Sequence, residues 1–115
     1  MIRTPIKFCR NCGTAVVHRV PDDGDTRVRA VCPHCATIQY ENPLNVVGTL
    51  PVLDDGRILL CKRNIEPRRG LWTLPAGFME LQETTARGAQ RETDEEAGAD
   101  LEMGRLFSLV NVPYV

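Results

Sequence analysis

Four of the five cysteines in this 115-residue chain form two C-x2-C pairs, and their spacing constrains how the first third of the sequence can fold. The pairs are Cys9 with Cys12 and Cys32 with Cys35. Each pair can direct two thiolates at one tetrahedral ion, as structural zinc sites do. A stretch of about 40 residues buries too little apolar surface to fold alone. We therefore predict that these cysteines bind Zn²⁺, which would supply much of the local folding free energy.

Residues 14–31, between the two pairs, have the pattern of a β-hairpin with Pro21 to Gly24 at its turn. Together with the cysteines, this pattern makes residues 1–40 similar to a zinc ribbon. Disulfides are the alternative use of the cysteines, and they form mainly in secreted proteins. The segment from Met1 to Pro5 lacks the apolar core of a secretory signal, so we expect reduced cysteines and a cytoplasmic location.

The composition describes one modest domain beside this small module. The net charge is −1, 43% of the residues are hydrophobic, and no long apolar run is present. A membrane span is therefore not expected. A charge so close to neutral also disfavours nucleic acid as the main partner. We expect a small molecule as the partner, and the composition leaves a homodimer open.

A connector is predicted at residues 37–43, and the second domain follows it. Its first elements are predicted to be two strands at residues 45–53 and 57–62. The sequence Asp54-Asp55-Gly56 between them is a tight hairpin signal.

Three further elements are predicted downstream. Residues 71–74 and 101–110 have the pattern of strands. A helix is predicted between them, from Thr84 to Ala97, because Thr84 is a suitable N-cap. Gly98 suits the left-handed position that ends a helix.

This predicted helix carries acidic and small residues on adjacent faces. At about 100° per residue, Glu92, Glu95 and Glu96 share one arc. Close acids near a helix C-terminus repel each other and oppose the helix dipole. Hard divalent cations such as Mg²⁺ or Mn²⁺ would relieve this repulsion, and a solvated acidic helix end is the alternative. The face expected to pack consists of Ala86, Ala89, Thr93 and Ala97.

The glycine and charged residues of this region follow the spacing G-x5-E-x7-R-E-U-x-E-E-x-G-U, where U is a bulky aliphatic residue. The matching residues are Gly77, Glu83, Arg91, Glu92, Glu95, Glu96 and Gly98. This pattern resembles the Nudix box. Thr93 and Ala99 occupy the U positions and are small or partly polar, which predicts looser helix packing without a change in the chemistry.

The sequence GLWTLPAG before the box, with CKRN at residues 61–64, resembles a ribbon-bearing Nudix subgroup. This subgroup comprises the plant plastid FAD and ADP-ribose pyrophosphatases and their bacterial relatives. The resemblance implies an α+β protein in which a zinc ribbon at residues 1–40 precedes a Nudix-type α/β/α sandwich with a mixed sheet at residues 43–115. Such domains usually extend further than this chain, so we expect the C-terminal part of the sandwich to be missing and Val115 not to be a natural end.

The resemblance implies metal-dependent hydrolysis of the pyrophosphate bond in a nucleoside diphosphate linked to another moiety, with FAD or ADP-ribose as the expected substrate. NADH pyrophosphatase activity is the first alternative. It is disfavoured here because Ser108 to Pro113 do not match the Ser-Gln-Pro-Trp-Pro-Phe-Pro motif of that group. The second alternative is a nucleotide-sensing regulator without enzymatic activity, in which the zinc ribbon serves as an interaction module.

The resemblance also implies roles for individual residues. The expected catalytic metal, Mg²⁺ or Mn²⁺, would be bound by Glu92, Glu95 and Glu96, with the Gly77 carbonyl as a further ligand. Glu83 would bind a second ion or orient the site, and Arg91 would steer a carboxylate by ion pairing. Basic residues near the box either contact substrate phosphates or are solvated, and these are Lys62, Arg63, Arg68 and Arg69.

Overall fold

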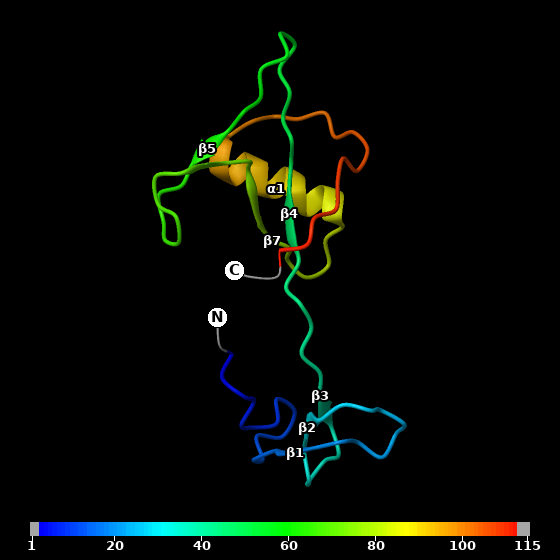
Figure 1. The fold of residues 1–115 in the computed structure, drawn as a ribbon. Coiled ribbons are helices and arrows are strands. Elements are labelled where there is room, and N and C mark those ends of the chain that lie inside the picture. Colours follow the sequence, from blue (N-terminus) through cyan, green and yellow to red (C-terminus); the bar gives the residue numbers. More distant parts are fainter. Residues whose placement is uncertain (1–2, 113–115) are drawn as a thin grey trace. The chain divides into compact units, whose positions relative to one another are not determined.

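The computed structural model describes residues 3–112 and divides them into two compact units (Figure 1). The first unit comprises the described residues up to Pro43 together with Val112, and the second covers Leu44–Asn111. The predicted second domain runs to Val115, and its last three residues lie outside the described ones. Within the described residues, no helix combines the length and the apolar character needed to cross a membrane.

The first unit is built on a three-stranded antiparallel sheet in the order β1-β2-β3. Strand β1 (Val17–Arg19) pairs with β2 (Arg29–Val31) as the two arms of the predicted hairpin. Strand β3 (Ile38–Gln39) then pairs with the other edge of β2. The prediction of a connector at residues 37–43 was therefore wrong for Ile38 and Gln39. The turn after Cys32, closed by its N–H to the Thr37 carbonyl at 3.0 Å, brings these residues back beside β2.

The second unit contains two separate pairs of antiparallel strands. Strand β4 (Val46–Gly48) pairs with β7 (Ala76–Phe78), and β5 (Cys61–Lys62) pairs with β6 (Trp72–Thr73). The predicted turn at residues 54–56 is present, and Gly56 has a φ of 86° there.

The prediction of two long strands around this turn is correct only for the residues next to the turn. The N–H of Leu53 donates to the Arg57 carbonyl at 2.8 Å, and the N–H of Leu59 donates to the Pro51 carbonyl at 3.1 Å. Beyond this point the arms separate, because β4 and β5 each bond to a later strand instead of to each other. The strand partners are distant in sequence, and local patterns do not report them.

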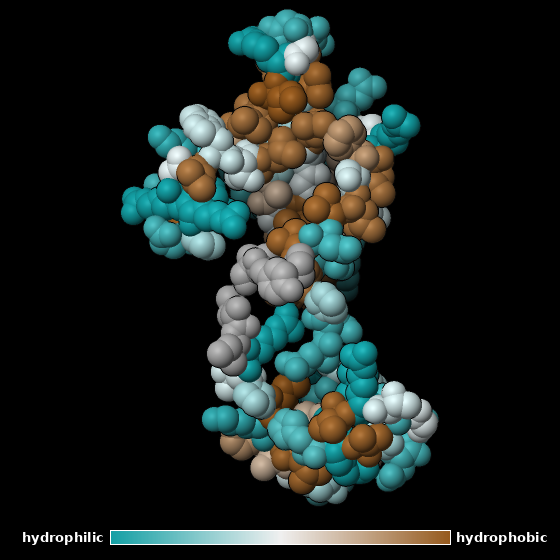
Figure 2. Space-filling model, in the orientation of Figure 1, coloured by the Kyte–Doolittle hydropathy of each residue, from teal (hydrophilic) through white to brown (hydrophobic). Residues whose placement is uncertain are grey.

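The strand predicted at residues 101–110 is not formed in the described part of the chain. Its apolar side chains remain exposed, with Leu106 and Phe107 at 78% and Leu109 at 88%. A strand requires a neighbouring ladder for its backbone groups, and no described segment pairs with this one. Figure 2 shows many such apolar side chains gathered on the surface of the second unit.

Helix α1 (Thr85–Ala97) begins and ends as predicted. Thr84 is the N-cap, and its hydroxyl accepts a hydrogen bond from the Arg87 N–H at 3.2 Å. Gly98 ends the helix with a φ of 58°, and its N–H donates to the Asp94 carbonyl at 2.8 Å. These short-range signals locate the helix because each is satisfied within one turn of chain.

The helix packs on β4 and β7, with Gly88, Ala89 and Thr93 as its buried residues. The prediction of the packing face was wrong for Ala86 and Ala97, which are exposed. A Cβ on Gly88 would lie 2.9 Å from Val47 Cγ2. The absence of a side chain at residue 88 therefore allows the helix backbone to approach β4 closely, which turns this side of the helix toward the strands.

Thr93 does not loosen the packing, contrary to the expectation for its position. Its side chain is fully buried, and its hydroxyl donates to the Ala89 carbonyl at 2.8 Å. The Thr49 hydroxyl lies 2.7 Å from the Thr93 hydroxyl oxygen. Because the single proton of Thr93 is already used, Thr49 must be the donor in this pair. Thr49 also donates its backbone N–H to the Pro75 carbonyl at 3.1 Å, so the pair ties the helix to the strands beside β7.

We expect Thr93→Val to lower the free energy of unfolding by about 1 to 3 kcal/mol, because it leaves the buried Thr49 hydroxyl without its acceptor. The double variant Thr49→Val/Thr93→Val should recover most of this loss, since two apolar groups of the same shape replace the pair. Urea unfolding of the parent chain, the single variants Thr49→Val and Thr93→Val and the double variant measures these effects. Thr85→Val, at an exposed helix position, is the control and should have little effect. Additive losses in the double variant would contradict a coupled pair.

Candidate functional site

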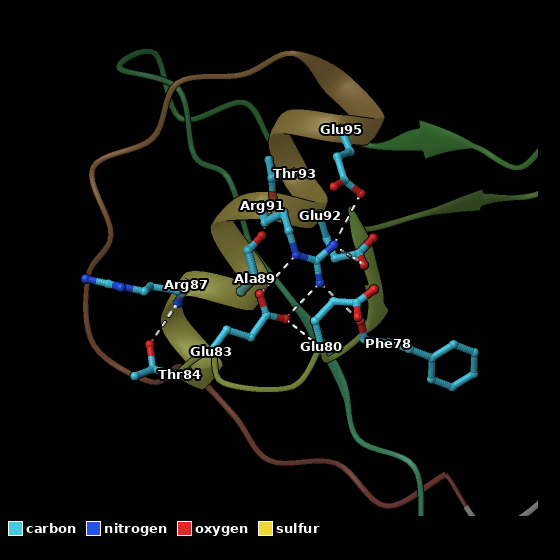
Figure 3. A network of polar contacts seen from close by, with 10 residues as sticks. All are labelled: Phe78, Glu80, Glu83, Thr84, Arg87, Ala89, Arg91, Glu92, Thr93 and Glu95. Atoms are coloured by element: carbon cyan, nitrogen blue, oxygen red, sulfur yellow. Dashed lines mark hydrogen bonds and ion pairs between the residues drawn. The ribbon is translucent and has the colours of Figure 1, made fainter.

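Arg91 lies at the centre of a polar network that joins the helix to the loop before it (Figure 3). Its guanidinium holds Glu83 with two parallel bonds, from Nε at 3.0 Å and from Nη2 at 2.8 Å. Nη1 donates to Glu92 at 2.9 Å and to Glu95 at 3.2 Å, and Nη2 also reaches the Phe78 carbonyl at 3.2 Å. Paired bonds of this kind fix geometry as well as charge.

Glu83 belongs to the loop between β7 and α1, and its carboxylate is held from both sides. It accepts the Glu80 backbone N–H at 2.6 Å as well as the two bonds from Arg91. The hydrogen bonds from Arg91, and then the one from Glu80, lower the pKa of Glu83 to about 2. The side chain therefore stays ionised at neutral pH and acts as an anchor for Arg91.

Glu92 and Glu96 face β7 from one side of the helix. A Cβ on Gly77 would overlap the Glu92 carboxylate, so a side chain at residue 77 would displace this acid from its place beside the strand. Glu96 accepts the Ala76 backbone N–H at 3.1 Å. Glu95 is more open, with its side chain 59% exposed, and its contact is with Arg91. The sequence motif therefore places Glu92 and Glu96 beside β7, and Glu92 and Glu95 beside the Arg91 guanidinium.

The glutamates are near one another, but their carboxylate oxygens do not form a tight cluster of metal ligands. Among the described residues, the four cysteines form the only group of three or more candidate metal ligands whose atoms all lie within 4.8 Å of each other. Arg91 offsets one of the charges on Glu83, Glu92 and Glu95, which leaves two negative charges uncompensated. The donors here are all oxygens, and such sets suit Mg²⁺ or Mn²⁺. The residues therefore fit the expected metal.

Of the four basic residues predicted as substrate contacts, two have other neighbours and two are exposed. Lys62 Nζ lies over the Trp72 ring at 5.8 Å from its centroid, and Arg63 Nε donates to the Pro67 carbonyl at 2.8 Å. Arg68 and Arg69 are exposed in the loop between β5 and β6. In the described structure none of these side chains bonds to the glutamates, so their role as phosphate contacts stays a prediction.

The four cysteines of the first unit converge as a zinc site requires. Their sulfur atoms all lie within 4.8 Å of one another, with Cys9 3.6 Å from Cys35 and Cys12 3.5 Å from Cys32. Tetrahedral zinc with Zn–S bonds of about 2.3 Å places its sulfurs roughly 3.8 Å apart. The ribbon therefore fits one structural Zn²⁺.

Two threonine hydroxyls lie within hydrogen-bond distance of these sulfurs, and neither contact was predicted from the sequence. Thr14 Oγ1 lies 3.2 Å from Cys12 Sγ, and Thr37 Oγ1 lies 3.0 Å from Cys35 Sγ. The side chain and backbone of Thr14 lower the pKa of Cys12. The corresponding bonds of Thr37, followed by Asn11, lower the pKa of Cys35 to about 5. A signal was present, because a threonine follows the second cysteine of each pair by two residues.

Two known protein families match this chain, one for each part of it. The NUDIX domain family matches residues 43–114, and the family described as Nudix N-terminal, a zinc ribbon, matches residues 7–41. The chain belongs to the Nudix family. The prediction of a Nudix protein with an N-terminal zinc ribbon is thereby confirmed.

Several relatives support this assignment. The NAD-capped RNA hydrolase NudC of Haemophilus influenzae (strain PittGG) is 32% identical over 88% of this chain and 37% of the relative. The mitochondrial NAD(P)H pyrophosphatase NUDT13 of Mus musculus is 32% identical over 84% of this chain and 25% of its own. The crystal structure of a NUDIX hydrolase from Nitrosomonas europaea is 54% identical, with a TM-score of 0.72 over 78% of this chain and 50% of that one. The chain thus spans half or less of each of these proteins.

The zinc assignment predicts that protein purified without added metal contains one zinc per chain, as elemental analysis would show. Removal of the metal by a chelator should unfold the ribbon, because the four sulfurs replace a hydrophobic core. Cys9→Ser should reduce both zinc content and stability. Folded, zinc-free protein with Cys9–Cys12 or Cys32–Cys35 oxidised would rule the assignment out.

Glu83 predicts a pH-dependent contribution to stability. Its folded pKa of about 2 lies below the ordinary value of 4.5, so the stabilisation is complete above pH 4.5 and is lost as the pH falls toward 2. Glu83→Gln should therefore be less stable than the parent chain at pH 7, and the difference should shrink below pH 4.5. Denaturant unfolding followed by helix circular dichroism measures it. Glu102→Gln, at an exposed position, is the control. A difference that is the same at pH 7 and pH 3 would contradict the assigned cause.

Proposed function

We propose that this chain carries the metal site of a Nudix pyrophosphohydrolase whose substrate is an NAD-type dinucleotide. The observation that carries the proposal is that Glu92 and Glu95 contact Arg91, while Glu92 and Glu96 lie against β7 at Gly77 and Ala76. Such a site can hold a divalent ion against a diphosphate. The reaction is hydrolysis of the pyrophosphate bond, which gives two phosphorylated products.

The choice of substrate class differs from the expectation of FAD or ADP-ribose. The NudC and NUDT13 relatives align with more than four fifths of this chain, and their names refer to NAD-capped RNA and to NAD(P)H. These similarities extend across both units, whereas the FAD and ADP-ribose expectation rested on two short sequence patterns. The first alternative, NADH pyrophosphatase activity, is therefore the better supported.

The residues of this chain would perform distinct tasks in that reaction. A bound Mg²⁺ or Mn²⁺ would supply charge neutralisation of the diphosphate and a more acidic water. Glu92, Glu95 and Glu96 would hold it, with Glu92 and Glu96 on the side of the helix that faces β7 and the Gly77 carbonyl beside them. Arg91 keeps Glu92 and Glu95 oriented, and Glu83 keeps Arg91 in place. Positioning and electrostatics account for most of the catalysis in phosphoryl transfer.

A nucleotide-sensing regulator is less well supported. A protein that only senses nucleotides does not need the complete set of motif glutamates. The relatives above are named as hydrolases or pyrophosphatases. The zinc ribbon is compatible with either function. Catalytic turnover therefore separates the two.

The substrate is tested with the full-length protein, Mg²⁺ and four compounds, namely NADH, NAD-capped RNA, FAD and ADP-ribose, followed by product analysis. We expect metal-dependent cleavage with NADH or the NAD-capped RNA preferred. Preference for the RNA over NADH would show that nucleic acid is a partner, against the charge-based expectation. Preference for FAD or ADP-ribose would overturn the substrate class, and absence of cleavage of all four would favour the sensor.

Variants of the helix test the site itself. Glu95→Gln and Glu96→Gln keep the shape of the side chain and remove one negative charge, so each should reduce kcat by roughly 10²- to 10³-fold. Folding, measured by circular dichroism, should change little. Steady-state hydrolysis at saturating Mg²⁺ provides the measurement.

Asp94→Asn is the matched control for these variants. Asp94 is exposed on the same helix, about 160° around the axis from Glu92. Its removal deletes the same charge without touching the face toward β7, so activity should be nearly unchanged. If Asp94→Asn were as damaging as Glu96→Gln, the acidic segment would act through its total charge and the metal-site assignment would fail.

A further inference from the structure

Gln39 is a polar side chain buried inside the ribbon, outside the set of expected zinc ligands. It lies in β3 opposite Ala30 of β2, and only 4% of the residue is exposed. Its Nε2 donates to Cys9 Sγ at 3.4 Å, and its Oε1 accepts the Arg10 backbone N–H at 3.4 Å. One buried amide therefore connects the last strand of the sheet with the first cysteine pair.

The orientation of this amide is determined by its neighbours. Nε2 also donates to the Thr37 carbonyl at 3.5 Å. A flipped amide would direct its oxygen at two acceptors, the carbonyl of Thr37 and the sulfur of Cys9, and its NH₂ group at the N–H of Arg10. Only the observed orientation satisfies all three neighbours.

Cys9, like Cys32 at 1% exposed, is almost fully buried and therefore depends on hydrogen-bond donors to solvate its thiolate. It is 3% exposed, so water contributes little to solvating its thiolate, whereas Cys12 is exposed and Cys35 is half-buried. Its other donor is the Asn11 backbone N–H at 3.4 Å. Among the described residues other than the four cysteines, Gln39 is the one side chain that donates a hydrogen bond to Cys9.

We propose that Gln39 is a positioning residue of the zinc site, which holds the Cys9 thiolate in place and thereby increases zinc affinity and slows zinc release. Hydrogen bonds to metal ligands orient them and stabilise their charged form. The bond also couples the sheet to the metal, since the same side chain is fixed by β3 and by the loop of the first pair. A role limited to filling space beside Ala30 is the alternative.

Two substitutions of Gln39 separate these roles. Gln39→Glu keeps the acceptor for Arg10 N–H but removes the donor and directs an oxygen at the Cys9 sulfur. Gln39→Met keeps the length and apolar bulk while removing both polar functions. Gln90→Glu, at an exposed position of α1, makes the same chemical change away from the zinc site and serves as the control.

Zinc affinity is measured on the whole chain by competition with a chelator, and zinc release by a colorimetric indicator. We expect Gln39→Glu to weaken affinity by about 10- to 100-fold, Gln39→Met to weaken it less, and Gln90→Glu to leave it unchanged. Cobalt substitution gives an independent readout, because a displaced Cys9 thiolate changes the sulfur-to-cobalt absorption bands of both variants at residue 39.

Wild-type affinity, release rate and cobalt spectrum in Gln39→Glu would overturn the proposal. If that variant does not fold, Gln39→Met decides the matter. Faster zinc release with an altered cobalt spectrum would support a positioning role, and unchanged values in a folded Gln39→Met protein would assign Gln39 to packing alone.

Discussion

The second unit depends on one guanidinium. Arg91 joins a strand carbonyl at Phe78, a loop acid at Glu83 and two helix acids at Glu92 and Glu95. Its side chain is only 27% exposed, and those of Glu83 and Glu92 are 13% exposed, so solvent screens these ion pairs less than it would at an open surface. Without this residue, the loop, the strand end and the helix would lose their common charge partner, and the acids would repel each other.

The two units reach stability by different physical means. The ribbon has few buried apolar residues, and two of them are the metal-binding Cys9 and Cys32. Binding of a metal by the four sulfurs therefore takes the place of a hydrophobic core. The second unit relies on close approach of one helix to two strands, which the small residues Gly88 and Ala89 permit. The buried residues of both units are small. Each unit also has charged or polarisable groups that suit a cation.

The features that could be predicted from the sequence were those set by nearby residues. The cap at Thr84, the helix end at Gly98 and the β1–β2 hairpin each depend on contacts within a short segment. The strand pairings could not be predicted in the same way, because β4 pairs with a segment that follows it by nearly 30 residues. The prediction for Thr93 was wrong for a similar reason, since its hydroxyl contacts Thr49, which follows β4 and is distant in the sequence. The motif gave the identities of the acids, while their contacts followed from tertiary structure.

The acids of the motif also differ in what they remain free to do. Both oxygens of Glu83 are occupied by Arg91 and the Glu80 N–H, and its low pKa reflects that engagement. Of the two roles considered for Glu83, orientation of the site therefore fits better than binding of a second ion. Glu96 has one backbone partner, and the single contact of Glu95 is an exposed one with Arg91. Lone pairs therefore remain on both carboxylates, and the negative charge that Arg91 leaves uncompensated is available to a divalent cation.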